Sequence, residues 1–111
     1  MKFAVIGSRG FNDYELLEDE LKRYQITTVI SGGAKGADSL ARDYAIAKNL
    51  QYEEHLPDWD KHGKGAGIIR NRDIVNNSDV VIAFWDGKSK GTKYSIEYGI
   101  KQGKQVFVRY Y

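Results

Sequence analysis

Hydrophobic residues along this chain occur both as short continuous runs and as stripes at helical spacing. Apolar runs within residues 2–6 and 79–85 predict buried strands, because both faces of a parallel strand are covered. The β-branched residues of 27–31 predict another strand. Residues 105–111 predict a further strand, and residues 51–55 a weaker one. The charges of this weaker strand favour the edge of a sheet, since they could not lie between two covered faces.

Apolar residues three and four apart predict helices between these strands, over residues 14–24, 37–45, 68–78 and 93–103. Asn12 and Glu15 have the spacing of a capping box at the start of the first helix. In the last helix, Ile96, Gly99, Ile100 and Gly103 are predicted to lie on the face towards the sheet, where glycine allows close packing. Residues 56–67 are predicted to form a long loop.

The alternation of strands and helices predicts one α/β domain over residues 1–111, with about five mostly parallel strands and four helices in three layers. Right-handed crossovers limit the winding to the Rossmann-like or the flavodoxin-like order. In either order, the loops at the carboxyl ends of the strands line one crevice.

Composition narrows the class of protein further. The chain has 111 residues, 41% of them hydrophobic, and no cysteine, which removes disulfides and thiolate metal sites. No apolar run approaches the roughly 20 residues of a membrane span. We therefore expect a cytoplasmic protein with no membrane contact. The net charge of +2 gives no global attraction to nucleic acid.

Glycine placement is the unusual feature of the sequence. Three glycine clusters follow predicted strands, in "GSRG" (7–10), "SGGAKG" (31–36) and "DGKSKG" (86–91). Bare amides at a strand-to-helix turn favour an anion, most often phosphate, while the alternative is that these glycines only allow sharp turns. Neither a GxGxxG fingerprint nor a GxxxxGK[ST] loop is present, so hydride transfer and nucleotide triphosphatase activity have little support.

The predicted ligand contacts are the residues of these loops and the polar or aromatic side chains near them: Gly7, Ser8, Arg9, Ser31, Gly32, Gly33, Ala34, Lys35, Gly36, Asp38, Trp59, Arg70, Asn71, Asp86, Gly87, Ser89, Gly91 and Thr92. Trp59 could stack on a base or fill the end of the core. Asp38 could bond a ribose hydroxyl or favour the positive end of a helix. Arg70 and Asn71 could bind phosphate or ribose, or could belong to a solvated face.

A metal site is not expected. Residues 55–62 contain two histidines and two aspartates, but their spacing suits no zinc pattern. We also expect no required cofactor.

The succession "GSRGFND", "SGGAKGAD", "DW…GKGAG…RN" and "AFWDGKSKGT" resembles the SLOG superfamily of Rossmann-like domains over residues 3–108, and most closely its small stand-alone group. Distant relatives include the cytokinin-activating phosphoribohydrolases, the DNA-processing protein A and ligand-sensing modules of anti-phage systems. The resemblance implies a pocket for nucleotides or nucleotide-derived molecules at the glycine loops.

One departure from the phosphoribohydrolases concerns catalysis. Their PGGxGTxxE motif ends in a catalytic glutamate, and that position is Ser95 in this chain. Glu97 is about 200° further round the helix and should point elsewhere. The resemblance places the other catalytic residue, an arginine, at Arg70 or Arg72. Asp38, Asp86 and Glu97 are the weak candidates for the missing carboxylate.

Three functions follow from these observations. The first is a module that binds a phosphate-bearing nucleotide or nucleotide derivative, for sensing or sequestration. The alternative is an N-glycosidase of the phosphoribohydrolase type, so whether the chain is an enzyme stays open. The second alternative is single-stranded nucleic acid binding through a local basic patch with stacking aromatics. Exposed aromatics at Tyr110 and Tyr111 are candidates for a homo-oligomer contact.

Overall fold

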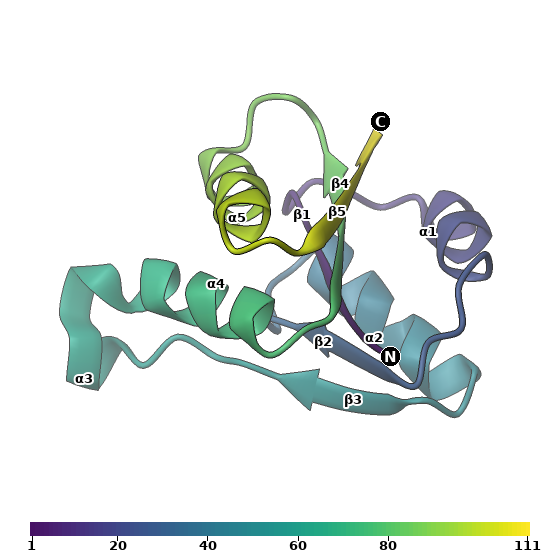
Figure 1. Ribbon diagram of the computed structural model, residues 1–111, viewed down its shortest axis with the longest axis horizontal. Helices are drawn as coiled ribbons and strands as arrows, with labels where there is room; N and C mark the ends of the chain where they lie inside the picture. Colours follow the sequence, from purple (N-terminus) through teal and green to yellow (C-terminus); the bar gives the residue numbers. More distant parts are fainter.

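The computed structural model describes residues 1–111 and contains one five-stranded parallel sheet (Figure 1). Its strands, in chain order, are β1 (Lys2–Gly7), β2 (Thr28–Ser31), β3 (Gln51–Glu54), β4 (Val80–Trp85) and β5 (Gln105–Tyr110). Their order across the sheet is β3-β2-β1-β4-β5, and every pair is parallel. This is the Rossmann-like winding, in which the strand order reverses between β1 and β4. The predicted fold class is confirmed, and so is the edge position of β3.

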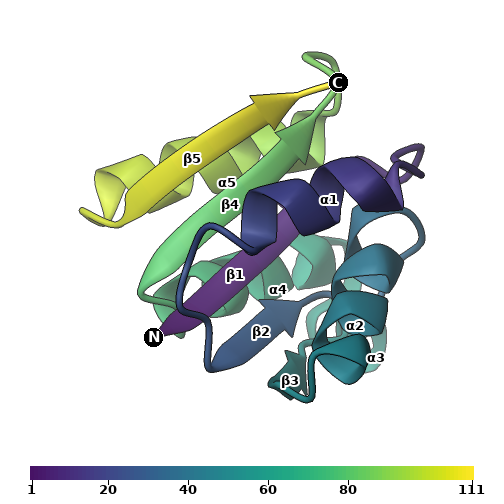
Figure 2. The ribbon, with the colours of Figure 1, turned by 90° about the vertical axis from the view of Figure 1, so that its right-hand side faces the viewer.

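Helices cover both faces of the sheet (Figures 1 and 2). The helices on one face are α1 (Tyr14–Leu21) and α2 (Ala37–Ala47), and those on the other are α4 (Ala66–Asn76) and α5 (Lys90–Lys101). Each helix that connects two parallel strands therefore lies in one of two layers, one on each face of the sheet. Right-handed connections give this arrangement.

Strand β1 shows how the sequence produces the two layers. Phe3 and Val5 join the core beneath α1 and α2, while Ala4 and Ile6 join the core beneath α4 and α5. Successive side chains point to opposite faces of a strand, so a strand covered on both faces must be apolar at every position. The continuous run "FAVI" satisfies this requirement.

Two predictions about where helices begin were wrong. The predicted loop over residues 56–67 contains a short helix, α3 (Trp59–His62), and a 3-10 turn over Gly63–Gly65. The Asp58 carboxylate caps α3 by accepting from the Lys61 amide at 3.0 Å. Likewise, α1 is capped by Asp13, which accepts from the Leu16 amide at 3.0 Å. Asn12 lies one residue too early to satisfy an amide of the first turn.

The packing face of α5 also differs from the prediction. Ile96 and Gly99 face the sheet, but Ile100 is 62% exposed. A Cβ on Gly99 would lie 3.0 Å from Val106 Cγ2, so the bare glycine lets α5 come close to β5. The buried stripe is completed by Thr92 and Ser95, which places Ile100 on its flank.

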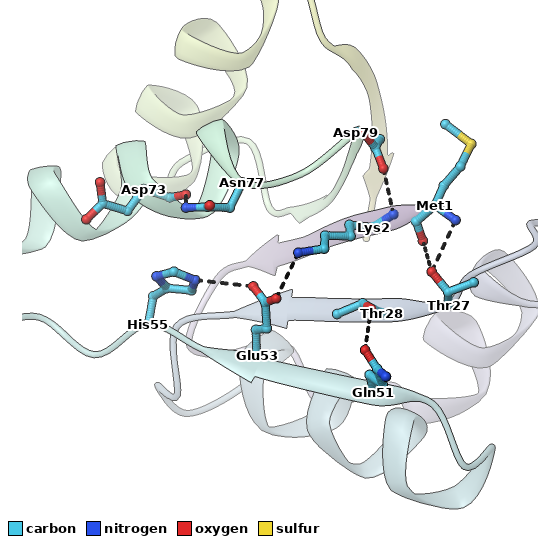
Figure 3. A network of polar contacts seen from close by, with 10 residues as sticks. All are labelled: Met1, Lys2, Thr27, Thr28, Gln51, Glu53, His55, Asp73, Asn77 and Asp79. Atoms are coloured by element: carbon cyan, nitrogen blue, oxygen red, sulfur yellow. Dashed lines mark hydrogen bonds and ion pairs between the residues drawn. The ribbon is translucent and has the colours of Figure 1, made fainter.

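A polar network runs across the sheet from the start of β1 and the residue before β4 to the carboxyl end of β3 (Figure 3). The Lys2 ammonium lies 3.0 Å from Glu53 of β3, and the Lys2 amide donates to Asp79 at 2.8 Å. The His55 ring lies 3.6 Å from the second oxygen of Glu53. The hydrogen bond from Lys2 is the main reason that the pKa of Glu53 lies below its usual value.

We predict that Glu53→Gln lowers the free energy of unfolding at pH 7 by up to about 1 kcal/mol, because exposed ion pairs contribute little. Since the folded-state pKa of Glu53 is lowered, its contribution is present above the unfolded-state pKa, near 4.5, and is lost as pH falls through the folded-state value. Urea unfolding of both proteins at pH 7 and pH 3 should therefore show a difference only at pH 7. Glu97→Gln, at an exposed position without an ion pair, is the control. A difference that persists at pH 3 would contradict the assignment.

Candidate functional site: a polar cavity where the strand order reverses

A cavity of about 480 Å³ opens where the order of the sheet reverses, beside the carboxyl ends of β1 and β4. Only three of its fifteen lining residues are hydrophobic. The lining consists of Ile6, Gly7, Ser8, Arg9, Gly10, Ala34, Asp38, Arg70, Asn71, Ile74, Asp86, Ser89, Gly91, Thr92 and Ser95. Open α/β sheets bind their ligands at this position, because adjacent loops diverge there.

The backbone of Ser8 joins the three loops around the cavity. Its amide donates to the Phe84 carbonyl of β4 at 3.1 Å. Its carbonyl accepts from the amides of Phe11 at 3.2 Å and Ala37 at 3.4 Å. The first residue after β1 is thus fixed to both β4 and the start of α2.

Gly36 is required for this junction. Its φ is +77°, and a Cβ there would lie 2.4 Å from the Arg9 carbonyl oxygen and 2.5 Å from that of Ser8. Gly7 is equally enclosed, since its Cβ would meet the Phe84 carbonyl oxygen at 2.5 Å. These two glycines therefore let backbone segments of the protein approach one another.

Several hydrogen-bond donors in and beside the cavity have no partner within the chain. Ser8 is 4% exposed, and its hydroxyl makes no hydrogen bond in the protein, although it lies near enough to the Asp86 carboxylate to help lower the pKa of that group. The amides of Arg9 and Gly10 donate to no acceptor within the chain, and neither do those of Lys90 and Gly91 in the first turn of α5. Ser8 is buried, and a buried polar group is rarely left unpaired, so its hydroxyl indicates a position for a hydrogen-bond acceptor. Arg9, Gly10, Lys90 and Gly91 are exposed, so their amides are open to water or to an acceptor that enters the cavity.

Space above two of these donors is open. Gly10 and Gly91 line the cavity, and a Cβ at either position would meet no atom within 4 Å. An acceptor can therefore approach their amides closely. The amino end of the twelve-residue helix α5 adds a positive dipole end at the same place.

The two arginines that line the cavity differ in their exposure and in their hydrogen bonds. Arg9 is exposed, and its guanidinium makes no hydrogen bond or ion pair within the chain. Arg70 is half-buried and donates to the Gly32 carbonyl and to Asn71 Oδ1, both at 2.9 Å. Burial lowers the pKa of Arg70, while the nearby Asp38 carboxylate opposes that change. Arg9 is therefore the cation that is free to meet a ligand.

Two aspartates balance these charges. Asp38 of α2 is buried, and burial raises its pKa although the Ala34 amide and Arg70 favour its charged form. The Ala34 amide donates to Asp38 Oδ2 at 3.1 Å. Asp86 follows β4 and is exposed, and its Oδ1 accepts from the amides of Ser89 and Lys88, both at 2.8 Å. These amides lower the pKa of Asp86 and fix the shape of its loop.

Most of the residues predicted to contact a ligand come together at this cavity. They are Gly7, Ser8, Arg9, Ala34, Asp38, Arg70, Asn71, Asp86, Ser89, Gly91 and Thr92. Ser31, Gly32, Gly33, Lys35, Gly36, Trp59 and Gly87 are outside its lining.

Contacts around the second glycine loop, residues 31–36, explain why several of these residues do not line the cavity. A Cβ on Gly32 would lie 2.5 Å from Arg70 Nη1, and one on Gly33 would lie 2.7 Å from a methyl carbon of Leu56. The Ser31 hydroxyl is fully buried and bonds the Tyr52 hydroxyl at 2.6 Å. Side chains of the protein therefore occupy the space above "SGG", and burial, as the main cause, raises the pKa of Tyr52 to about 12.

The remaining candidates lie on other surfaces. Trp59 belongs to α3 and is largely exposed, so it does not fill the end of the core. Arg72 donates to the Tyr94 hydroxyl at 2.6 Å on the outer side of α4 and α5, where Glu97 also lies. Of the catalytic candidates, only Arg70, Asp38 and Asp86 line the cavity.

Four lining residues were not predicted: Ile6, Gly10, Ile74 and Ser95. Gly10 lies within "GSRG" and could have been included with its neighbours. Ser95 was considered only as a missing glutamate, yet it is buried on the same stripe of α5 as Thr92. For Ile6 and Ile74, the sequence predicted only a place in the hydrophobic core.

Fold and cavity together define a Rossmann-like α/β domain with a polar cavity where the strand order reverses. The chain belongs to the YAcAr family, described as the YspA, cpYpsA-related SLOG family, whose model matches residues 1–62. It is also similar to the Gene 61 protein of Mycobacterium phage D29, with 37% identity over 116 residues, covering 95% of this chain and 93% of the relative. The resemblance to the SLOG superfamily is thereby confirmed. No solved structure is significantly similar to the chain.

No three histidine or acidic side chains gather in a way that could hold a metal ion. None of the helices has the length and apolar character needed to cross a bilayer.

We predict that Ser8→Ala leaves the free energy of unfolding unchanged or raises it by about 1 kcal/mol, because a buried hydroxyl without a partner costs stability. Ser31→Ala is the matched control. It should lower the free energy of unfolding by about 1–2 kcal/mol, because it removes the hydrogen bond to Tyr52. Chemical denaturation measures both. Equal destabilisation by the two changes would show that Ser8 has a structural partner.

Proposed function

We propose that the cavity binds a phosphate-bearing nucleotide or a nucleotide-derived small molecule. The observation that carries this proposal is the set of unpaired donors at one place: the Ser8 hydroxyl and the amides of Arg9, Gly10 and Gly91. Phosphate oxygens accept several hydrogen bonds at once and carry the negative charge that a helix amino end and an arginine favour.

Size and location support a small molecule. The volume of about 480 Å³ lies within the range of ligand pockets, roughly 300–1,000 Å³. The cavity lies at the position where Rossmann-like sheets bind nucleotides, and membership of a SLOG family is compatible with nucleotide-related binding.

Polar groups away from the unpaired donors suit the rest of such a ligand. Asp38 uses Oδ2 for the Ala34 amide, so in this proposal Oδ1 accepts from a ribose hydroxyl. Asn71 uses Oδ1 for Arg70, which leaves its amide NH₂ as a donor. We assign the phosphate to the Ser8–Gly91 side and the sugar to the Asp38–Asn71 side.

The charge balance of the cavity argues against a groove for single-stranded nucleic acid. Its two arginines are offset by two aspartates, and no lysine lines it. Grooves that follow a nucleic acid backbone present one sign of charge over several nucleotides. We therefore favour one small anionic ligand over a polymer.

A panel of AMP, ADP, ADP-ribose, NAD and cyclic nucleotides tests the proposal by thermal shift and calorimetry. A ligand at a hundred times its Kd should stabilise the protein by about 2.7 kcal/mol, a shift of several degrees for a domain of this size. Arg9→Ala should weaken binding about 10- to 100-fold, because it removes a charge-assisted hydrogen bond. Lys35→Ala removes the same charge from outside the cavity and should change affinity less than about threefold.

Each mixture should also be assayed for released base. Release of base that is abolished by Asp38→Asn or Asp86→Asn would replace the binding module with a hydrolase at the same cavity, since both carboxylates line it. If no member of the panel binds or reacts, the proposal fails. Salt-dependent binding of a labelled single-stranded oligonucleotide would then support the nucleic acid alternative.

Gly91→Ala separates stability from binding. Gly91 lies in the first turn of α5, and its Cβ would meet no protein atom, so the change should keep or raise stability by up to about 1 kcal/mol. The added methyl group lies beside the unpaired amides and should weaken ligand binding about tenfold. Gly67→Ala on α4 is the matched control, because its Cβ would make an ordinary 3.8 Å contact with Trp59 and its position is outside the cavity. Equal affinity of both variants would contradict the assigned phosphate position.

A further inference from the structure

The two edges of the sheet differ in how they are protected. Strand β3 is four residues long, contains Glu53 and Glu54, and is followed by Pro57. Short length, charge and proline are the features that discourage an edge strand from pairing with another chain. Strand β5 is six residues long, has no proline, glycine or bulge, and contains one charged residue, Arg109.

The charge on β5 does not protect its edge. The Arg109 guanidinium points back to Glu20 of α1, at 3.9 Å. Glu20 is buried at this contact, with 9% of its surface exposed. The outer edge of β5 therefore presents unpaired backbone groups beside side chains of which only the half-exposed Arg109 is charged.

Aromatic side chains beside this edge are exposed. Phe107 is 39% exposed, Tyr110 63% and Tyr111 46%. Phe107 contacts Tyr24, with ring centroids 5.5 Å apart, at the rim of an apolar hollow of about 390 Å³. Figure 2 shows α5 behind β5, whereas α1 lies over the middle of the sheet and leaves the near face of β5 uncovered.

We infer that β5 is a homodimer interface, at which β5 of a second copy pairs in antiparallel fashion about a two-fold axis. Antiparallel pairing matches the unpaired N–H and C=O groups of one edge with the same groups of an identical edge. The occupant is a second copy because the edge is complementary to itself.

The charges of β5 agree with this pairing. With the axis at Phe107, the two phenyl rings meet, Val106 lies opposite the partner's Val108, and Gln105 lies opposite the partner's Arg109. Opposite residues then share a face of the continuous sheet. No two like charges are opposed, and β-branched and aromatic residues pair across the axis, which stabilises sheets.

The exposed area sets the strength of the dimer. A fully covered aromatic side chain buries about 150–250 Å², so these three partly exposed ones contribute roughly 300 Å² per copy. Standard interfaces bury about 800 Å² per partner. The backbone edge and flanking residues supply the rest only in part, so the dimer is reversible, with a Kd of about micromolar order.

Sedimentation velocity from about 1 to 200 µM tests the inference. The wild-type chain should shift from monomer to dimer over this range. Phe107→Lys should raise the dissociation constant at least tenfold, because it places two like charges on the axis. Ile100→Lys, the same kind of change at an exposed residue of α5, should leave the constant unchanged.

Tyr110→Lys, on the opposite face of β5, provides a second test if Phe107→Lys fails to fold. Hydrogen exchange should also show β5 amides becoming protected as the concentration rises. A wild-type chain that is monomeric up to 200 µM would overturn the inference. So would a dimer that Ile100→Lys weakens as strongly as the β5 variants do. Because β5 does not line the cavity, ligand binding should be equal in monomer and dimer.

Discussion

The structure depends on one close backbone contact, where the loop after β2 meets the residue after β1. Ser8 connects to Phe84 of β4 through its amide and to Ala37 of α2 through its carbonyl. Only a glycine at position 36 lets the chain come this near, because any side chain there would overlap the carbonyl oxygens of Ser8 and Arg9. The same contact leaves the Ser8 hydroxyl buried without a partner and holds the next two amides beside the cavity. Folding and the shape of the cavity are thus set by the same few backbone atoms.

Much of the architecture could be predicted from the sequence, because its signals are local or strongly patterned. Continuous apolar runs such as "FAVI" identify strands that are covered on both faces. Alternation of strands and helices then leaves few windings. Element ends were less predictable: Asp13 and Asn12 are both good caps, and only the geometry shows which carboxylate or amide reaches the Leu16 amide. The short helix α3 depends on Asp58 in the same way.

The site was harder to predict than the fold, because a glycine can leave space either for a ligand or for another part of the protein. Gly32, Gly33 and Gly36 looked like a loop kept bare for an anion, yet protein atoms fill the space above each of them. Gly10 and Gly91 have open space above them, and a sequence cannot distinguish these cases. Which amides are unpaired depends on contacts between distant segments, such as Ser8 with Phe84. The direction of a side chain on α5 depends on how the helix is rotated about its axis. Ser95 faces the cavity, while Glu97 faces away.

The wall of the cavity is divided between the segment that the family model matches and the segment that follows it. Residues 1–62, which match the family model, supply Ser8, Arg9 and Asp38, together with Gly36 and Ala37 of the backbone junction. The second segment supplies Arg70, and the start of α5 with Gly91. Substitutions in this second segment can reshape one wall without disturbing the backbone contact at Gly36. Under the proposed function, such a domain can change the molecule it recognises while its first half keeps the same sequence, so two proteins that share this first half need not share a ligand.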